Sequence, residues 1–189
     1  MADTNENNMS RLVITLTLIG IISALLLSFV FQWTDPYIKG HQEENREEAI
    51  YGVLPGADRY ETVEKEGLEF FEGFSKNGQK VGVAVLVSGS GFQGEIEVMV
   101  GTDPEAEKIY HIKILEHQET PGLGARITES GFRDNFVDKP FGNYDIVQEA
   151  DDPLEVEGIS GATISSKNVT EIVEKAVEDI QNIYGGGSK

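Results

Sequence analysis

The strongest hydrophobic pattern in the chain is one uninterrupted apolar run near its beginning. It reads LVITLTLIGIISALLLSFVFQW from Leu12 to Trp33, with no charged residue between Arg11 and Asp35. A bilayer core requires about 20 apolar residues in a helix. A cleaved signal peptide has a shorter apolar core of about 7–15 residues followed by small residues, whereas this run ends in bulky ones. The pattern therefore predicts an uncleaved transmembrane helix over residues 12–34.

The pattern changes beyond the apolar run. A charge-rich stretch, Tyr37–Leu54, has the features of a helix that ends at Pro55-Gly56. Alternating or valine-rich segments then predict strands joined at glycine- and proline-containing turns. The predicted strands are 68–74, 80–87, 95–100 and 108–115, with turns at 77–78, 89–91 and 103–104. Together they predict an antiparallel sheet.

The clearest predicted element is a C-terminal amphipathic helix over 165–184. Its apolar residues recur at helical spacing, with Glu and Lys on the opposite face; they are Val169, Ile172, Val173, Ala176, Val177, Ile180 and Ile183. A short helix over 127–136 and a short strand over 145–148 precede it. The predicted fold class is α+β: a single N-terminal transmembrane helix, then an antiparallel sheet packed with helices.

Charge and composition narrow the function. The 189 residues include 33 acidic and 15 basic side chains, a net charge of −18, which argues against nucleic acid as a partner. The absence of cysteine excludes disulfides, thiolate zinc sites, cysteine-ligated iron–sulfur clusters and a cysteine nucleophile. His41, His111 and His117 have no metal-ligand spacing, so we expect no metal site.

The distribution of charge also predicts topology. The acidic surplus lies almost entirely after the apolar run, and it is poorly suited to an anionic cytoplasmic leaflet. We therefore expect a cytoplasmic tail at 1–11, an extracytoplasmic domain over 35–184 and a flexible tail at 185–189. The predicted location is the inner (plasma) membrane, crossed once.

One candidate binding segment is EGISGATISS at 157–166, directly before the C-terminal helix. Such a loop exposes backbone N–H groups at a helix N-terminus, where the helix dipole favours an anion. Ser160, Thr163, Ser165 and Ser166 add hydroxyl donors. The alternative is an ordinary Ser/Thr N-cap.

A second candidate segment is EHQETPGLGAR at 116–126. Its glycines allow the backbone to approach a planar ligand closely, and Leu123 could cover an apolar ring face. The alternative is a simple Pro-Gly turn.

Taken together, these segments resemble the flavin-binding domain shared by the G subunit of the Rnf electron-transport complex and the C subunit of the Na⁺-translocating NADH:quinone reductase. The resemblance covers nearly the whole chain. Besides the anchor, it rests on AIYGVLPG at 49–56, GFQGEI at 91–96, HQETPGLGAR at 117–126 and SGATISS at 160–166. The length of the chain and its ETPGLG sequence are more similar to those of the Rnf subunit than to those of the quinone-reductase subunit.

The resemblance implies a covalent FMN joined through its phosphate to Thr163, the threonine that closes the SGAT stretch. It implies that Glu119, Thr120 and Leu123 neighbour the flavin ring, and that Lys167 either meets the phosphate or lies on the surface. A separate flavin transferase makes the bond in this family; its recognition pattern has Asp where this chain has Glu157. The full set of candidate cofactor-binding residues is Thr163, Ser160, Gly161, Ala162, Glu119, Thr120, Pro121, Gly122, Leu123, Gly124, Ser165 and Lys167.

The functional hypothesis is a membrane-anchored electron relay within an ion-translocating complex. A flavin carries the redox chemistry itself, so no catalytic acid, base or nucleophile is expected of the chain. The resemblance implies other membrane subunits as partners, with ferredoxin and NAD⁺ as the terminal redox partners. Two alternatives remain: an FMN protein of another respiratory or extracellular electron-transfer chain, and a non-redox module that binds a phosphate-bearing ligand.

Overall fold

The structure is a computed structural model that describes residues 3–185. Within this range the chain divides into two compact units, with the boundary between Glu44 and Asn45. The predicted tail at 185–189 lies outside the described residues except for Gly185, as do the first two residues of the tail at 1–11.

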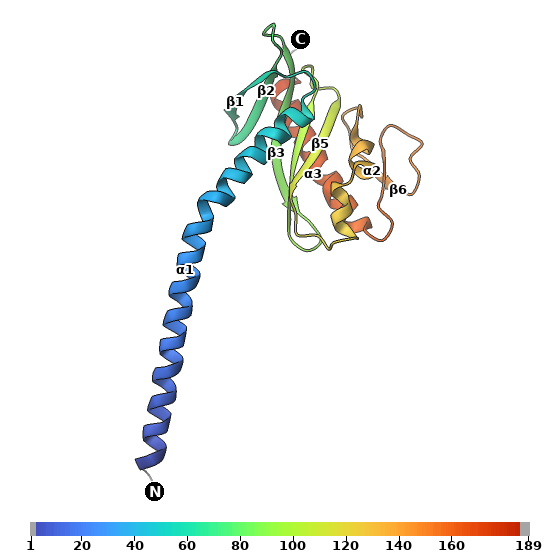
Figure 1. Ribbon diagram of the computed structural model, residues 1–189. Coiled ribbons are helices and arrows are strands. Elements are labelled where there is room, and N and C mark those ends of the chain that lie inside the picture. The colour runs from blue at the N-terminus through green and yellow to red at the C-terminus, as the bar shows by residue number, and fades with distance from the viewer. Residues whose placement is uncertain (1–2, 186–189) are drawn as a thin grey trace. The chain divides into compact units, whose positions relative to one another are not determined.

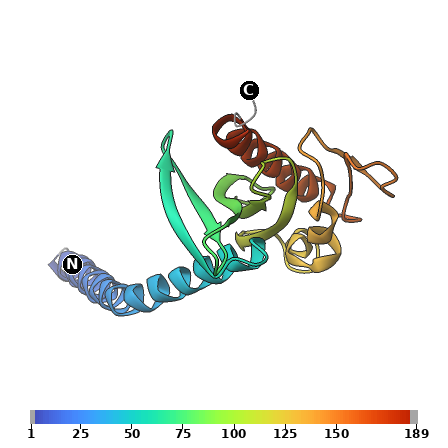
Figure 2. The same ribbon diagram turned by 90° about the horizontal axis from the view of Figure 1, so that it is seen from above.

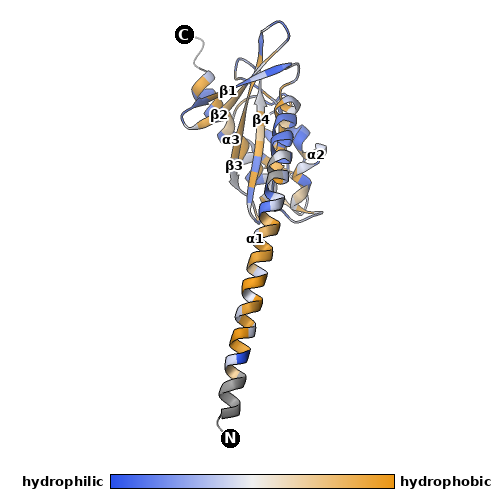
Figure 3. Cartoon of the chain, turned by 60° about the vertical axis from the view of Figure 1, so that its left-hand side comes forward, coloured by the Kyte–Doolittle hydropathy of each residue, from blue (hydrophilic) through white to orange (hydrophobic). Residues whose placement is uncertain are grey.

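The first unit consists of helix α1, Asp3–Val53, which continues into the second unit. The predicted anchor and the helix expected after it thus form one continuous helix, which ends beside Pro55-Gly56 as expected. Large apolar side chains of the anchor are exposed, for example Leu27 at 72% and Phe29 at 67%. Figure 3 shows the apolar stretch on α1. This helix is long and apolar enough to cross a membrane, and none of its apolar window is buried, which fits a membrane anchor.

The second unit is built on a five-stranded antiparallel sheet in the order β1-β2-β3-β4-β5. The strands are β1 Arg59–Lys65, β2 Leu68–Phe74, β3 Lys80–Ser90, β4 Glu95–Thr102 and β5 Ile109–Glu116. The four predicted strands and their antiparallel pairing are confirmed, although β3 extends to Ser90 and moves its turn to 91–94. β1 was not predicted.

Helices cover both faces of this sheet (Figures 1 and 2). Helix α3, Thr163–Tyr184, packs against β3 and β4, and the apolar residues predicted for its inner face are buried, with Ile183 partly so. The last turns of α1 contribute Ala49, Ile50, Val53 and Leu54 to a second cluster on the opposite face. There Gly101 has no side chain because a Cβ would lie 2.2 Å from the carbonyl oxygen of Val53.

The segment between β5 and α3 is irregular. The helix predicted over 127–136 is divided into three short pieces: η1 Gly124–Thr128, α2 Ser130–Arg133 and η2 Asp134–Phe136. The division occurs at Glu129, whose ψ of 148° is extended and incompatible with a continuous helix. The strand predicted at 145–148 is β6, Asp145–Val147, and it pairs in parallel with an unpredicted strand, β7, Glu155–Glu157.

A partly buried pair of opposed carboxylates in the sheet yields a pH-dependent prediction. Glu97 lies directly opposite Glu116 in the β4–β5 pairing, and burial, followed by Glu116 and Glu95, raises the pKa of Glu97 above its ordinary value. The folded state therefore binds this proton more tightly than the unfolded state, and stability falls as the pH rises through the folded pKa. We expect Glu97→Gln to raise the melting temperature at pH 7, and this gain to vanish below the ordinary carboxyl range. Thermal unfolding of the full chain at both pH values checks this, with Glu107→Gln as a control that should change little, because Glu107 is exposed and lies outside the strands. An equal gain at both pH values would contradict the electrostatic cause.

Candidate functional site

Three segments that are distant in sequence meet at the N-terminus of α3: residues 91–94, 117–126 and 157–162. They border two hollows that share Gly161 and Thr163. The Leu123 hollow, of about 360 Å³, is lined by Phe92, Glu119, Thr120, Leu123, Gly124, Gly161, Ala162, Thr163, Ile164 and Ser165. The Arg126 hollow, of about 850 Å³, is lined by Arg126, Glu129, Gly131, Phe132, Ile146, Val147, Gln148, Glu157, Gly158, Ile159, Ser160, Gly161 and Thr163.

The carboxylate of Glu119 joins the three segments. Its Oε1 accepts hydrogen bonds from the backbone N–H groups of Phe92, at 2.6 Å, and Gln93, at 3.4 Å. Its Oε2 accepts one from the hydroxyl of Ser165 at 2.7 Å. The side chain is only 4% exposed, so these partners replace the water that a carboxylate would otherwise require. Glu119 therefore lies beneath the Leu123 hollow and holds its walls together.

Two glycines make room for this carboxylate. A Cβ at Gly91 would lie 2.5 Å from Oε1 of Glu119, and a Cβ at Gly124 would lie 2.4 Å from Oε2. Both distances are far shorter than a van der Waals contact. The first glycine of GFQG and the second glycine of PGLG are thus required by the position of Glu119.

Thr163 is the first residue of α3 and lies at the junction of the two hollows. The N-cap is Ala162, no side chain caps the helix, and the first turn contains no acidic residue. The Thr163 side chain is exposed, and its hydroxyl has no hydrogen-bond partner among the described residues. The dipole and the first N–H groups of α3 are therefore available to an anion at this position.

The serines that follow Thr163 point inward. Ser166 is fully buried; its hydroxyl accepts a hydrogen bond from the N–H of Ile159, at 2.9 Å, and donates to the carbonyl oxygen of Ala162, at 3.1 Å. Ser165 is 3% exposed and donates to Glu119. Both serine hydroxyls thus donate within the protein rather than toward a ligand, and the alternative of a Ser/Thr N-cap is wrong, because the N-cap is Ala162.

The structure brings most of the predicted site residues together. The Leu123 hollow contains the following predicted residues: Glu119, Thr120, Leu123, Gly124, Gly161, Ala162, Thr163 and Ser165. Ser160 lines the Arg126 hollow. Pro121 and Gly122 line neither hollow and form an exposed turn, in which Gly122 has a φ of 76° that favours glycine. Lys167 also lines neither; its Nζ lies 3.6 Å from Glu171 on the exposed face of α3.

Several residues that line the two hollows were not predicted as site residues, among them Phe92, Ile164 and Arg126. Phe92 and Ile164 line the Leu123 hollow and are 60% and 56% exposed, close to the 50% of Leu123. Ile164 could have been found, because it is an apolar residue outside the buried stripe of α3. Phe92 and Arg126 lie within the quoted segments 91–96 and 117–126, but only the tertiary fold brings them to the hollows that Thr163 borders.

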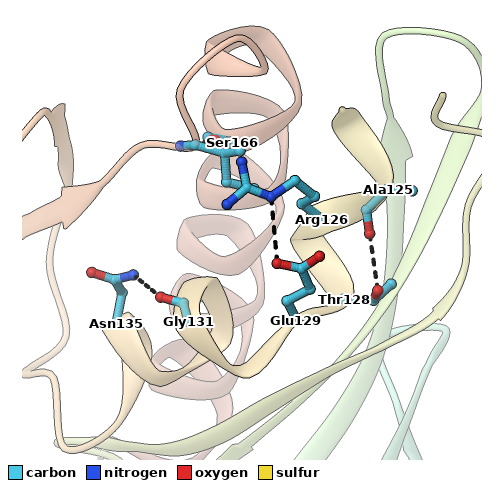
Figure 4. A network of polar contacts seen from close by, with 8 residues as sticks. Ala125, Arg126, Thr128, Glu129, Gly131, Asn135 and Ser166 are labelled. Atoms are coloured by element: carbon cyan, nitrogen blue, oxygen red, sulfur yellow. Dashed lines mark hydrogen bonds and ion pairs between the residues drawn. The ribbon is translucent and has the colours of Figure 1, made fainter. Parts of the chain in front are cut away.

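Arg126 belongs to a small polar network around η1 and α2 (Figure 4). Its Nε lies 3.4 Å from Oε2 of Glu129, and the hydroxyl of Thr128 donates to the carbonyl oxygen of Ala125 at 2.9 Å. Asn135 Nδ2 donates to the carbonyl oxygen of Gly131 at 3.1 Å. These contacts shape the wall of the Arg126 hollow opposite the N-terminus of α3.

Among residues 3–185, no group of three His, Cys, Asp or Glu side chains could hold a metal ion. His117 instead accepts a hydrogen bond at Nδ1 from the backbone N–H of Glu119, at 3.2 Å, and so helps to orient that residue.

Comparison with known proteins points to a single family. Residues 91–178 match the FMN-binding domain family. The chain is 31% identical to the G subunit of an ion-translocating oxidoreductase complex of Methanosarcina acetivorans, over 94% of this chain and 96% of that protein. It is 28% identical to the G subunit of a proton-translocating ferredoxin:NAD⁺ oxidoreductase complex of Clostridium ljungdahlii, over 97% and 98% of the two chains.

Solved structures support the fold. NqrC of Shewanella oneidensis superposes with a TM-score of 0.56 at 22% identity, covering 68% of this chain and 70% of that one. The C subunit of the Na⁺-translocating NADH-quinone reductase of Parabacteroides distasonis gives a TM-score of 0.57 at 22% identity, covering 77% and 84%. The chain therefore has the fold of these two proteins.

The position of Glu119 yields a prediction about stability. Glu119→Ala would leave two backbone N–H groups and the Ser165 hydroxyl without their acceptor. Since an unsatisfied buried polar group costs about 1–3 kcal/mol, we expect the free energy of unfolding to fall by about 2–3 kcal/mol. Glu119→Gln retains one oxygen acceptor and the side-chain volume, so its loss should be smaller. Urea denaturation of the full chain in detergent measures both variants; equal losses would show that the carboxylate does not organise the loops.

Proposed function

The chain belongs to the G-subunit family of Rnf-type ion-translocating electron-transport complexes, and on this premise we propose that it relays electrons through an FMN bound covalently to Thr163. The observation that carries the proposal is the free, exposed hydroxyl of Thr163 at an uncapped helix N-terminus beside the Leu123 hollow. The bond would be a phosphoester between the FMN phosphate and the threonine oxygen; its formation removes the hydroxyl proton of Thr163 and displaces a leaving group from an activated flavin phosphate, such as the nucleotide half of a flavin dinucleotide.

The residues present fit a phosphodiester at Thr163. Such a group is an anion, and the first turn of α3 offers N–H groups and a dipole without a competing acidic side chain. The competing hydroxyls are less suitable: those of Ser165 and Ser166 are buried and hydrogen-bonded. Ser160 is exposed but precedes the helix and borders only the Arg126 hollow. Accessibility and helix position together favour Thr163.

The residues present also fit a flat aromatic ring. Phe92, Leu123 and Ile164 place three exposed apolar side chains around the Leu123 hollow. Burying such side chains against a ring stabilises the bound state by about 25 cal/mol per Å² of apolar surface removed from water. FMN, when bound, supplies the capacity to take up and release electrons. The chain itself holds the ring, fixes the phosphate and limits access of water.

The attachment would be made by a flavin transferase that recognises the segment before α3. Glu157, which occupies the acidic position of the recognition pattern, is exposed and borders the Arg126 hollow together with Thr163. The backbone N–H of Glu157 donates to Oδ1 of Asn135 at 3.1 Å, which fixes the start of this segment. The exposed Glu157 side chain is accessible to the transferase. A glutamate at this position is therefore compatible with recognition.

We extend the proposal to the setting of the protein. Residues 12–34 would cross the plasma membrane once, leaving 1–11 in the cytoplasm and 35–184 as an extracytoplasmic FMN-binding domain. Relatives are named as subunits of ion-translocating complexes, two of them as ferredoxin:NAD⁺ oxidoreductases. The partners would then be other membrane subunits of such a complex, with ferredoxin and NAD⁺ as its terminal redox partners.

Attachment at Thr163 can be tested directly. The full chain is produced with a flavin transferase, denatured, separated by electrophoresis and viewed under ultraviolet light, with intact mass as a second measurement. The wild-type chain should fluoresce and carry the mass of one FMN as a phosphoester, and Thr163→Ala should lose both signals completely. Ser160→Ala is the matched control, because it removes a neighbouring exposed hydroxyl, and it should keep the flavin. Fluorescence that persists in Thr163→Ala would rule out the assigned site, and a wild-type chain without flavin would rule out covalent FMN.

The proposed topology can be tested because the chain contains no cysteine. Asn77→Cys introduces a single thiol at an exposed turn of the domain, and Ser10→Cys introduces one before the apolar run. The measurement uses cells whose outer envelope layers have been removed and whose plasma membrane is intact. A membrane-impermeant maleimide should label Asn77→Cys at once and Ser10→Cys only after the plasma membrane is permeabilised. The reverse pattern would place the domain in the cytoplasm.

A further inference from the structure

Arg126 is the feature of the site that the proposed function leaves without a role. It is the one basic residue among the described residues that line the Arg126 hollow, where Glu129 and Glu157 are acidic. Thr163 borders the same hollow, and η1, which carries Arg126, packs against α3. Figure 4 shows the Arg126 side chain extending from η1 toward α3.

The contact that Arg126 makes in this structure is weak. Its Nε lies 3.4 Å from Oε2 of Glu129, and the two side chains are 44% and 59% exposed. Exposed ion pairs of this kind contribute about 0–1 kcal/mol. A stronger acceptor within reach can therefore displace Glu129 at little cost.

The position of Arg126 is tied to that of the apolar wall. The backbone N–H of Leu123 donates to the carbonyl oxygen of Thr120 at 3.2 Å, that of Ala125 donates to the same oxygen at 3.1 Å, and that of Arg126 donates to the carbonyl oxygen of Leu123 at 3.1 Å. One tight turn thus places Leu123 in the first hollow and Arg126 in the second. A ligand with an apolar ring and an anionic group would meet both residues on the two sides of Thr163.

We infer that Arg126 binds the phosphodiester on Thr163, exchanging Glu129 for the phosphate oxygens when the flavin is attached. The inference rests on the proposed function, since it needs a phosphate at Thr163. A guanidinium can donate two parallel hydrogen bonds to a phosphate, which makes this pair stronger than a single contact with a carboxylate. Because the hollow also contains Glu157, a phosphate in it would otherwise face acidic neighbours.

Lys167 is the rival cation, since the sequence alone made it a candidate for the phosphate. It begins the second turn of α3 on the exposed face and pairs with Glu171, four residues further on, at 3.6 Å. Lys167 borders neither hollow. Binding of the phosphate by Arg126 and binding by Lys167 therefore predict different effects of removing each positive charge, and one measurement can separate them.

The test compares ³¹P nuclear magnetic resonance spectra of flavinylated full-length chains in a phosphorus-free detergent. In Arg126→Gln the resonance of the phosphodiester should move by more than its linewidth, because the phosphate loses its charged donor. Lys167→Gln, a matched loss of one positive charge from the same end of the domain, should leave the resonance at the wild-type position.

The outcomes separate this inference from the proposed function. If Arg126→Gln attaches too little flavin for a spectrum, the spectrum is recorded from Arg126→Lys instead. A shifted resonance in Arg126→Lys supports the inference, because lysine cannot donate two parallel hydrogen bonds to the phosphate. Wild-type resonances in both Arg126 variants would overturn the inference while leaving the covalent bond intact. A shift in Lys167→Gln alone would assign the phosphate to Lys167. A wild-type chain with no ³¹P signal would end both proposals.

Discussion

The site depends on one buried carboxylate. Glu119 accepts hydrogen bonds from the 91–94 hairpin and from the first turn of α3, while it belongs to the loop that follows β5. Because the carboxylate is almost fully buried, losing any one partner leaves polar groups without water or protein to replace it. The three segments therefore hold their positions together, and the walls of the Leu123 hollow are formed before any ligand arrives. Pre-formed walls favour tight, oriented binding because little order has to be created on binding.

The regular part of this arrangement could be predicted from local pattern. The apolar stripe of α3 and the alternating pattern of β5 correctly predicted a helix and a strand, since each element buries one face against the core. β1 was missed because its sequence, RYETVEK, is largely polar and half-exposed on the sheet edge. The predicted helix at 127–136 failed because Glu129 adopts an extended conformation that no helical periodicity reveals. Local pattern is informative where one face is buried and fails where tertiary contacts decide the backbone.

The site shows the same division. Thr163 and Leu123 were predicted from their sequence segments and Glu119 from the resemblance, but the structural role of Glu119 was not predicted, because its partners are 26, 27 and 46 residues away. The inward position of Ser165 and Ser166 follows from helical phase: they continue the buried stripe of Val169, Ile172 and Val173. Thr163, Ile164 and Lys167 lie on the exposed side of that same helix. Helical phase thus buries the hydroxyls of Ser165 and Ser166 and leaves the hydroxyl of Thr163 accessible.

The net charge of −18 would give a physical reason for the proposed covalent attachment of the cofactor. A free FMN phosphate carries a charge of roughly −1.5 to −2 at neutral pH, as other phosphate monoesters do. An acidic domain repels such an ion over a Debye length of about 8 Å at physiological salt, and one helix N-terminus contributes only about 1 kcal/mol against that repulsion. A phosphodiester lowers the charge to about −1 and makes retention independent of the electrostatic balance. In the proposed arrangement, a phosphodiester on Thr163 would need only local compensation, at the first turn of α3 and from a nearby cation.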